Sequence, residues 1–277
     1  MFFKYCAYLR VYYLMFESLM GRLFVFKRFR TNVLSLTSVA VWVALRIGAM
    51  DIPDKRKIHN RPTPKLGGLA VFIGILVSLL LNNIWNPQII WLLICTGAIF
   101  AMGVVEDSIG IPAWVRLFIQ AGLVTIMLNS GVVLKVFPRY MILGELANEL
   151  LTVIWFVGIT NAFNFFDGMD GLASGLGIFM GTFLGAIAFS TDQAQLGWIS
   201  VAVVGSALGF FPHNFKFKRP AEIFLGESGS TLFGFILTWL AVHGEWAVGH
   251  PLLNLSPPLL IFWVLIYGMI HTTISRI

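Results

Sequence analysis

The stretch Asn161-Ala-Phe-Asn-Phe-Phe-Asp-Gly-Met-Asp-Gly-Leu-Ala173 joins one apolar run of the chain to the next. It places two carboxamides, Asn161 and Asn164, and two carboxylates, Asp167 and Asp170, among glycines. The spacing of three residues would put successive polar side chains on one face of a helix. Ionisable groups next to membrane segments are costly and usually functional. The stretch therefore predicts a functional site at a helix junction, with helix capping by Asn and Asp as the simpler alternative.

Composition places the chain in the membrane class. Of its 277 residues, 58% are hydrophobic and 12% are charged, and the mean hydropathy is +0.84. A soluble domain carries about 25% charged residues. In so apolar a chain, the net charge of +6 indicates cytoplasmic loops that face anionic lipid, and no nucleic-acid partner. The composition predicts an all-α fold, a polytopic integral membrane helix bundle.

Nine apolar runs follow one another along the chain. Several are shorter than the roughly 20 residues that a spanning helix needs. The sequence predicts about nine transmembrane helices in one membrane-embedded domain over residues 31–277, and an N-terminal extension over residues 1–30 that is either interfacial or disordered. The runs lie near residues 32–50, 66–82, 88–105, 114–131, 146–161, 172–190, 197–212, 230–243 and 258–271.

Basic and acidic residues share one set of alternate loops. Beyond the first run, the loops on one side hold most of the lysines and arginines, whereas the opposite loops hold only Lys135 and Arg139. The positive-inside rule makes the first side cytoplasmic. Acidic residues in three separate loops on that side could converge on one cation. Those residues are Glu106, Asp107, Asp167, Asp170, Glu222 and Glu227.

A transporter or a channel is a competing class of protein. Such a protein would carry ionisable groups near the bilayer midplane, often in broken helices or inverted repeats. The centres of the nine runs hold almost no such groups. The distribution of charge therefore favours a site at the membrane surface.

Three further motifs surround the opening stretch. The adjacent carboxylates of Glu106 and Asp107 repel each other, so they favour a bound metal ion or proton, although a solvated helix end is the simpler interpretation. The segment Phe224-Leu-Gly-Glu-Ser-Gly-Ser230 could form an anion-binding nest at a helix N-terminus, with Glu227 free to hold a cation, or it could be a plain helix cap. The basic loop at 51–68 suits phosphate recognition or is an ordinary positive-inside loop.

Together these motifs resemble the bacterial polyprenyl-phosphate N-acetylhexosamine-1-phosphate transferases. The resemblance covers roughly residues 31–277 and is most specific at 161–173 and 224–230. It implies an enzyme that transfers a sugar-1-phosphate, with GlcNAc-1-phosphate expected, from a UDP-sugar to undecaprenyl phosphate and releases UMP. The reaction would take place at the cytoplasmic side of the bacterial inner membrane, as the first membrane step of cell-envelope polysaccharide synthesis.

The resemblance also implies roles for single residues. Glu227 and Asp107 would hold Mg²⁺, or Mn²⁺ in its place, since phosphoryl transfer needs charge neutralisation more than covalent chemistry. Glu106, Asp107, Asp167 and Asp170 would be the catalytic carboxylates. The expected partners are undecaprenyl phosphate, a UDP-N-acetylhexosamine, membrane lipid and a second copy of the chain. The residues expected to bind substrate are Arg56, Lys57, His59, Asn161, Asn164, Asn214 and Phe224.

The chain departs from the usual pattern of the family at several places. Glu106 and Glu227 stand where the family usually has Asp, and His271 stands where it has another Asp. The family's next loop carries a His-x-His-His motif that would follow Ile277, so the domain is expected to be C-terminally incomplete. A shift of about 1 Å in a catalytic group can cost ~10²-fold in rate. A catalytically impaired relative that only binds lipid carrier or nucleotide-sugar is therefore the alternative function.

Overall fold

The computed structural model describes residues 37–52, 62–138, 141, 143–246 and 251–275. In this part of the chain, the helix Thr37–Ile47 precedes eight longer helices and one small hairpin, so the prediction of an all-α helix bundle is confirmed. The N-terminal extension and the residues Arg56, Lys57 and His59 lie outside the described ranges. The elements are β1 (Met50–Asp51), β2 (Thr63–Pro64), α2 (Gly67–Leu81), α3 (Pro87–Ile109), α4 (Ala113–Asn129), α5 (Gly144–Phe166), α6 (Leu172–Ser190), α7 (Ala194–Asn214), α8 (Gly226–His243) and α9 (Pro251–Ser275).

Three helices continue beyond their apolar runs into the polar residues of interest. The last turn of α3 contains Glu106 and Asp107, the last turns of α5 contain Asn161 and Asn164, and the first turn of α8 contains Glu227. Hydropathy marks only the apolar part of a helix, whereas backbone hydrogen bonding continues until a residue breaks it. These side chains therefore lie on the ends of helices and not in loops.

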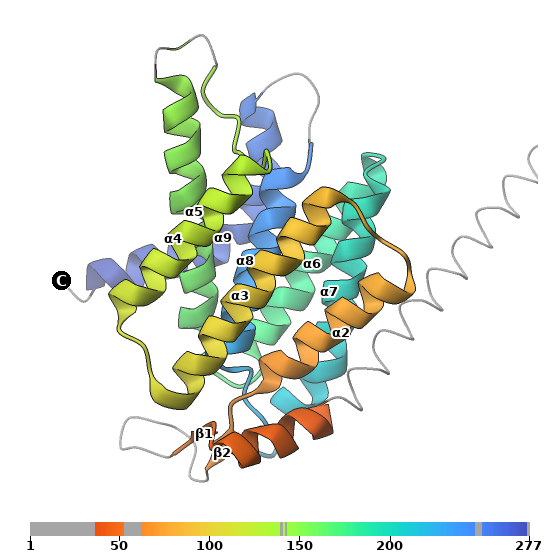
Figure 1. Ribbon diagram of the computed structural model, residues 1–277, viewed down its shortest axis with the longest axis vertical. Coiled ribbons are helices and arrows are strands. Elements are labelled where there is room, and N and C mark those ends of the chain that lie inside the picture. The colour runs from red at the N-terminus through yellow and green to blue at the C-terminus, as the bar shows by residue number, and fades with distance from the viewer. Residues whose placement is uncertain (1–36, 53–61, 139–140, 142, 247–250, 276–277) are drawn as a thin grey trace, which may run out of the picture.

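α8 is the central helix of the bundle. It packs against α2, α3, α5 and α6 (Figure 1), and all its residues except Glu227 and His243 are buried. A helix that is buried on every side belongs to the core. Small residues permit the close approach: a Cβ atom on Gly103 would lie 2.4 Å from the Cα atom of Ser228, and one on Gly234 would lie 2.6 Å from the Cα atom of Thr160.

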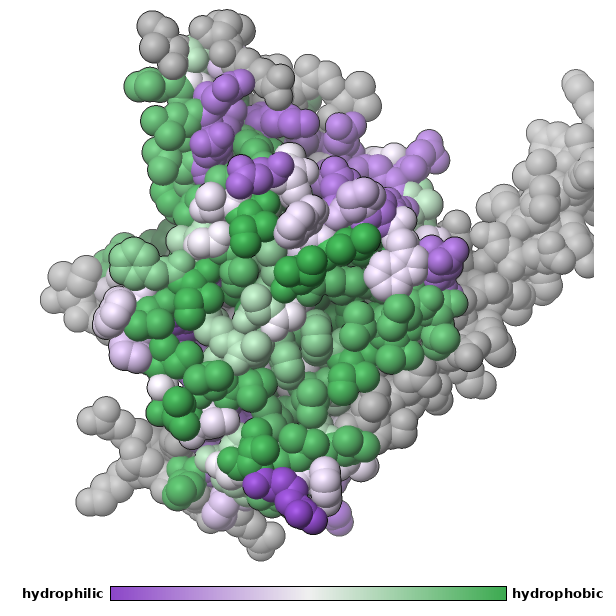
Figure 2. Space-filling model, viewed as in Figure 1, coloured by the Kyte–Doolittle hydropathy of each residue, from purple (hydrophilic) through white to green (hydrophobic). Residues whose placement is uncertain are grey.

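The outer surface has the character of a membrane protein. Among the described residues, the helices α3, α5, α6, α7 and α9 are long and apolar enough to cross a membrane. Figure 2 shows hydrophobic side chains over the middle of the molecule, with hydrophilic ones gathered towards its upper and lower ends. Large apolar side chains such as Phe118, Ile154 and Leu260 are exposed on this surface. Hydrocarbon would cover them in a bilayer.

The hairpin of β1 and β2 lies at the lower end of the bundle in Figure 1. The N–H group of Phe224 donates to the carbonyl of Pro64 at 2.8 Å, and the N–H group of Gly67 donates to the carbonyl of Phe224 at 3.0 Å. The hairpin is therefore joined to the segment that leads into α8. The same end of the bundle contains the last turns of α3, α5 and α7.

The close packing around α8 gives a prediction for stability. Gly234→Ala should destabilise the protein by about 1–3 kcal/mol, because the added methyl group meets the backbone of α5 at Thr160. Gly158→Ala on α5 is the matched control, since nothing lies within 4 Å of its added Cβ atom. The control should be neutral or stabilise by about 0.5–1 kcal/mol. Thermal unfolding in detergent measures both, and equal midpoints for the two variants would contradict the packing described.

Candidate active site

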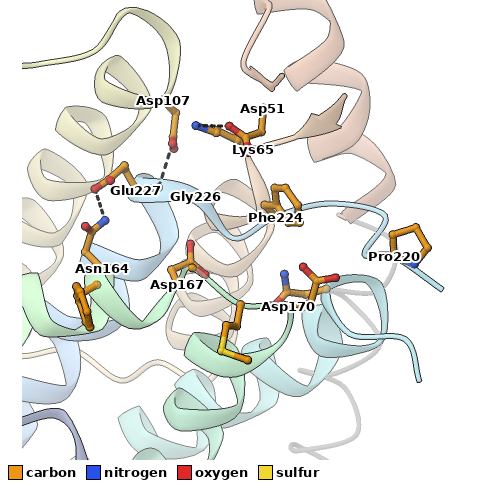
Figure 3. A pocket seen from close by; sticks show the side chains of 14 residues that line it. Asp51, Lys65, Asp107, Asn164, Asp167, Asp170, Pro220, Phe224, Gly226 and Glu227 are labelled. Atoms are coloured by element: carbon orange, nitrogen blue, oxygen red, sulfur yellow. Dashed lines mark hydrogen bonds and ion pairs between the residues drawn. The ribbon is translucent and has the colours of Figure 1, made fainter. Parts of the chain in front are cut away.

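A pocket of about 720 Å³ opens at the end of the bundle that carries the hairpin (Figure 3). Five carboxylates from four segments line it: Asp51, Asp107, Asp167, Asp170 and Glu227. Four of these are among the six acidic residues expected to converge, whereas Glu222 pairs with His213 and Lys216 and does not line the pocket. The polar and aromatic side chains that line it with them include Lys65, Asn164, Asn214, Phe165 and Phe224.

The first turn of α8 is bound by a carboxylate from another helix. The N-cap residue Leu225 offers no side-chain hydrogen bond. The two oxygens of Asp107 instead accept hydrogen bonds from the N–H groups of Glu227 and Ser228, each at 3.0 Å. These contacts satisfy N–H groups that a helix leaves without partners, and the negative charge suits its N-terminal dipole.

The hydrogen bonds at the start of α8 contradict the predicted anion-binding nest, and the close packing there requires glycine at position 226. The amides of Glu227 and Ser228 bind the carboxylate of Asp107, so they do not form the open anion-binding nest expected at Phe224–Ser230. Gly226 has φ +77°, and a Cβ atom there would lie 2.1 Å from the carbonyl oxygen of Lys65 and 2.7 Å from Oδ2 of Asp107. Only glycine permits this approach.

Glu227 projects from this turn into a polar network. Its Oε2 atom lies 3.2 Å from Nη1 of Arg116, and the same nitrogen lies 2.9 Å from Oε1 of Glu106. The amide of Asn164 donates to Glu227 and, at 3.2 Å, to the hydroxyl of Ser230. Arg116 on α4 thus joins the ends of α3 and α8 and fixes the direction of the Glu227 carboxylate.

Asp170 and Asn214 form hydrogen bonds with the loop that leads to Phe224, a residue that lines the pocket. Oδ2 of Asp170 accepts the N–H group of Ala221 at 3.1 Å. Oδ1 of Asn214 accepts the hydroxyl of Ser174 at 2.7 Å, and its amide donates to the carbonyl of Ile223 at 3.2 Å. Both side chains line the pocket, and both also fasten the segment before Phe224 to the start of α6.

The structure does not bring every predicted residue to the pocket. The amide of Asn161 donates to Gln120 at 2.6 Å and to the carbonyl of Val157 at 2.7 Å, and Asn161 is not among the lining residues. Its position on the helix, facing α4, removes it from the face that carries Asn164. Glu106 contacts Arg116 behind the lining, and the exposed His271 stacks on Tyr267 in α9.

Sequence reasoning missed two basic residues that the fold brings to the site. Lys65 lines the pocket and forms an ion pair with Asp51 at 2.9 Å, and Arg116 joins Glu106 to Glu227. Arg116 had been counted only as evidence of the cytoplasmic side, and Lys65 only as part of the basic loop at 51–68 that suits phosphate recognition. Their position directly after the hairpin and at the start of α4 was the available signal, but the contacts depend on tertiary packing.

The carboxylates of the pocket fit a hard cation. Burial raises the pKa of Asp167 well above its usual range, and the charges of Asp107 and Glu227 raise it further. A cation would offset this excess of negative charge. Among the described residues, no three acidic, His or Cys side chains lie close enough to hold one metal ion by themselves. Mg²⁺ needs no such group, since it commonly uses one or two carboxylates with waters and substrate phosphates.

The fold and the site together define a polytopic membrane protein with an acidic pocket at one end of its helix bundle. Residues 89–245, more than half of the chain, match the model of glycosyl transferase family 4. The chain belongs to this family.

Named relatives agree with the family. The chain is 34% identical over 253 residues to the probable undecaprenyl-phosphate N-acetylglucosaminyl 1-phosphate transferase of Bacillus subtilis (strain 168), which covers 89% of this chain and 69% of the relative. It is 31% identical over 244 residues to the undecaprenyl-phosphate alpha-N-acetylglucosaminyl 1-phosphate transferase of Thermotoga maritima, with 87% and 72% covered. It is 34% identical over 224 residues to the decaprenyl-phosphate N-acetylglucosaminephosphotransferase of Mycolicibacterium smegmatis, with 71% and 54% covered. The chain thus spans between 54% and 72% of these relatives.

The raised pKa of Asp167 gives a pH-dependent prediction. At pH values above the ordinary Asp pKa of about 3.9, the unfolded carboxyl loses its proton before the folded one does, so stability falls as pH rises towards the folded pKa. Asp167→Asn should therefore raise the midpoint of thermal unfolding at pH 7.5, and the gain should shrink as the pH falls towards 4. Glu149→Gln, exposed on α5, is the control. A lower midpoint for Asp167→Asn at pH 7.5 would contradict this electrostatic account.

A double-mutant cycle tests the bridge made by Arg116. Arg116→Met leaves two partly buried carboxylates without their cation, and Glu227→Gln in the same protein should recover part of the loss. The coupling between the two positions should be about 0.5–3 kcal/mol. The exposed pair Lys216–Glu222 provides the control cycle, with about 0.2–1 kcal/mol expected. Thermal unfolding gives both values, and additive effects at Arg116 and Glu227 would exclude the bridge.

Proposed function

We propose that the protein transfers a sugar-1-phosphate from a UDP-N-acetylhexosamine to undecaprenyl phosphate and releases UMP. GlcNAc-1-phosphate is the proposed group, since each of the three relatives above is named for transfer of N-acetylglucosamine phosphate. The observation that carries the proposal is the convergence of Asp107, Asp167 and Glu227 at the start of α8, in one pocket at the end of a membrane bundle.

The position of the pocket suits both substrates. A nucleotide-sugar is soluble, whereas the polyprenyl tail requires apolar surface. The pocket lies where helix ends meet the polar end of the molecule, and exposed apolar side chains cover the helices beside it. The excess of basic residues in the loops of this end supports a location in the bacterial inner membrane with the pocket towards the cytoplasm.

The reaction is a displacement at phosphorus. A phosphate oxygen of undecaprenyl phosphate attacks the β-phosphorus of the UDP-sugar. The bond between the β-phosphorus and the bridging oxygen breaks, and UMP leaves with that oxygen on its α-phosphate. Mg²⁺, when bound, would neutralise the diphosphate and stabilise the leaving phosphate. Glu227 and Asp107 would hold it, since their carboxylates are the donors that Mg²⁺ prefers.

The chain's own residues would position this reaction. Arg116 and Asn164 orient the carboxylate of Glu227, and Asp107 holds the turn from which Glu227 projects. Asp170 and Asn214 fix the loop before Phe224. The ring of Phe224 lines the pocket, where it would stack on uracil.

A relative that binds its substrates without catalysis is the second candidate. The carboxylate of Glu227 already has two protein partners, Arg116 and Asn164. If these contacts persist with substrate present, Glu227 would be a poor metal ligand. The chain would then bind nucleotide-sugar or lipid carrier without releasing UMP.

Release of UMP from UDP-GlcNAc separates the two candidates. The purified chain in detergent, with undecaprenyl phosphate and Mg²⁺, should release UMP, and EDTA should abolish the release until Mg²⁺ is restored. Glu227→Gln should lower kcat by about 10²-fold or more, because it removes a charge from the proposed metal site. Glu149→Gln, exposed on the same helix as Asn164, should keep the activity of the unmodified chain.

The outcomes have distinct meanings. Binding of UDP-GlcNAc without release of UMP would favour the second candidate. Equal rates for Glu227→Gln and the unmodified chain would exclude the proposed role of Glu227. A panel of UDP-sugars in the same assay would identify the sugar.

A further inference from the structure

Lys65 is the one basic side chain among the described residues that line the pocket. It shares this lining with the carboxylates of Asp51, Asp107, Asp167, Asp170 and Glu227. A substrate phosphate entering such a pocket meets a strongly negative surface. Phosphate recognition in proteins relies on cations, and a lysine ammonium serves as a compact point charge for this purpose.

Asp51 holds the ammonium of Lys65 at the wall of the pocket. The Nζ atom lies 2.9 Å from Oδ1 of Asp51, and the side chain of Lys65 remains 30% exposed whereas that of Asp51 is 10% exposed. In Figure 3 the ammonium reaches from Asp51 towards Asp107. An ammonium has three N–H donors, so a single carboxylate contact leaves donors for a second acceptor.

The backbone of Lys65 packs against the first turn of α8. Its N–H group donates to the carbonyl of Ala49 at 3.0 Å, and its own carbonyl abuts Gly226 so closely that a Cβ atom there would lie 2.1 Å away. The next residues pair with the segment before α8, through Gly67 and Phe224. A lysine held on this frame lies beside the first turn of α8, where the proposed chemistry takes place.

The charge of Lys65 is secure at neutral pH. Burial lowers its pKa, but the hydrogen bond to Asp51 and the charges of Asp51, Asp107 and Glu227 together raise it above the ordinary value. The ammonium therefore remains protonated while substrate binds.

We infer that Lys65 is a substrate-binding residue whose ammonium binds a phosphate oxygen of the substrate, while Asp51 keeps it in place. The inference rests on the proposed function and adds a residue to it. The diphosphate of the nucleotide-sugar and the phosphate of the lipid carrier share this chemistry, so the experiment has one arm for each.

Lys216 provides a closely matched control. It also forms an ion pair with a carboxylate, that of Glu222, and its side chain is 31% exposed. It lies in the loop after α7, at the same end of the bundle, but it does not line the pocket. Removing Lys216 deletes an ion-paired lysine without changing the charge in the pocket.

The experiment compares ligands that differ only by phosphate. The purified 277-residue chain in detergent is titrated with UDP and with uridine, and separately with a short-chain polyprenyl phosphate and its alcohol. Lys65→Met should weaken binding of UDP, of the polyprenyl phosphate, or of both by about tenfold or more, since hydrogen bonds to charged groups are strong. Binding of uridine and of the alcohol should not change. Lys65→Arg should keep most of the phosphate preference, and Lys216→Met should keep all of it.

If Lys65→Met weakens binding in only one of the two titrations, that titration shows whether Lys65 binds the nucleotide diphosphate or the lipid phosphate. Equal loss of uridine and UDP binding in Lys65→Met would show a structural role for the ion pair and overturn the inference. Unchanged binding of both phosphate ligands would overturn it as well. Thermal unfolding and size-exclusion chromatography check that each variant folds, and Lys65→Gln replaces Lys65→Met if the latter does not. If the unmodified chain binds neither phosphate ligand, the proposed function fails and the inference fails with it, a pattern distinct from loss in the variant alone.

Discussion

The carboxylate of Asp107 accepts hydrogen bonds from the N–H groups of Glu227 and Ser228, and this contact joins the end of α3 to the start of the central helix α8. α8 begins inside the bundle, where water cannot satisfy its first amides, so a buried partner is required. Asp107 supplies that partner from the end of α3. Asn164, near the end of α5, donates to Glu227 and to Ser230 in the same helix. The ends of α3 and α5 are thereby joined to the start of α8, and these contacts set the direction in which Glu227 projects.

The carboxylates around this turn also raise the electrostatic free energy of the folded protein. Asp167 keeps its proton more readily than an ordinary aspartate, because burial and the nearby carboxylates disfavour its charge. Two basic side chains offset part of this charge: Lys65 pairs with Asp51, and Arg116 pairs with both Glu106 and Glu227. A site with unrelieved negative charge is suited to a divalent cation and its diphosphate ligand. At Asp167, stability therefore opposes the function proposed for this pocket.

Much of the fold could be predicted from the sequence, because hydropathy reports directly on membrane helices. The apolar runs match the helices of the described residues, and the parity of charge placed the three acidic segments at one end. The contacts could not be predicted. Helix capping was considered for the Asn and Asp residues of 161–173 within their own segment, yet the carboxylate that caps α8 is that of Asp107, 120 residues before Glu227. Asn161 shares the spacing of Asn164 but faces α4, and nothing in the sequence distinguishes their directions.

The proposed function requires that acidic residues from three segments form one cation and diphosphate site at the start of α8. Electron paramagnetic resonance of Mn²⁺, titrated into the purified chain with UDP present, tests it without requiring turnover. We expect one bound Mn²⁺ per chain, with a signal that depends on UDP, disappears in Glu227→Gln and persists in Glu149→Gln. Binding of Mn²⁺ that is indifferent to UDP, or that survives intact in Glu227→Gln, would contradict it.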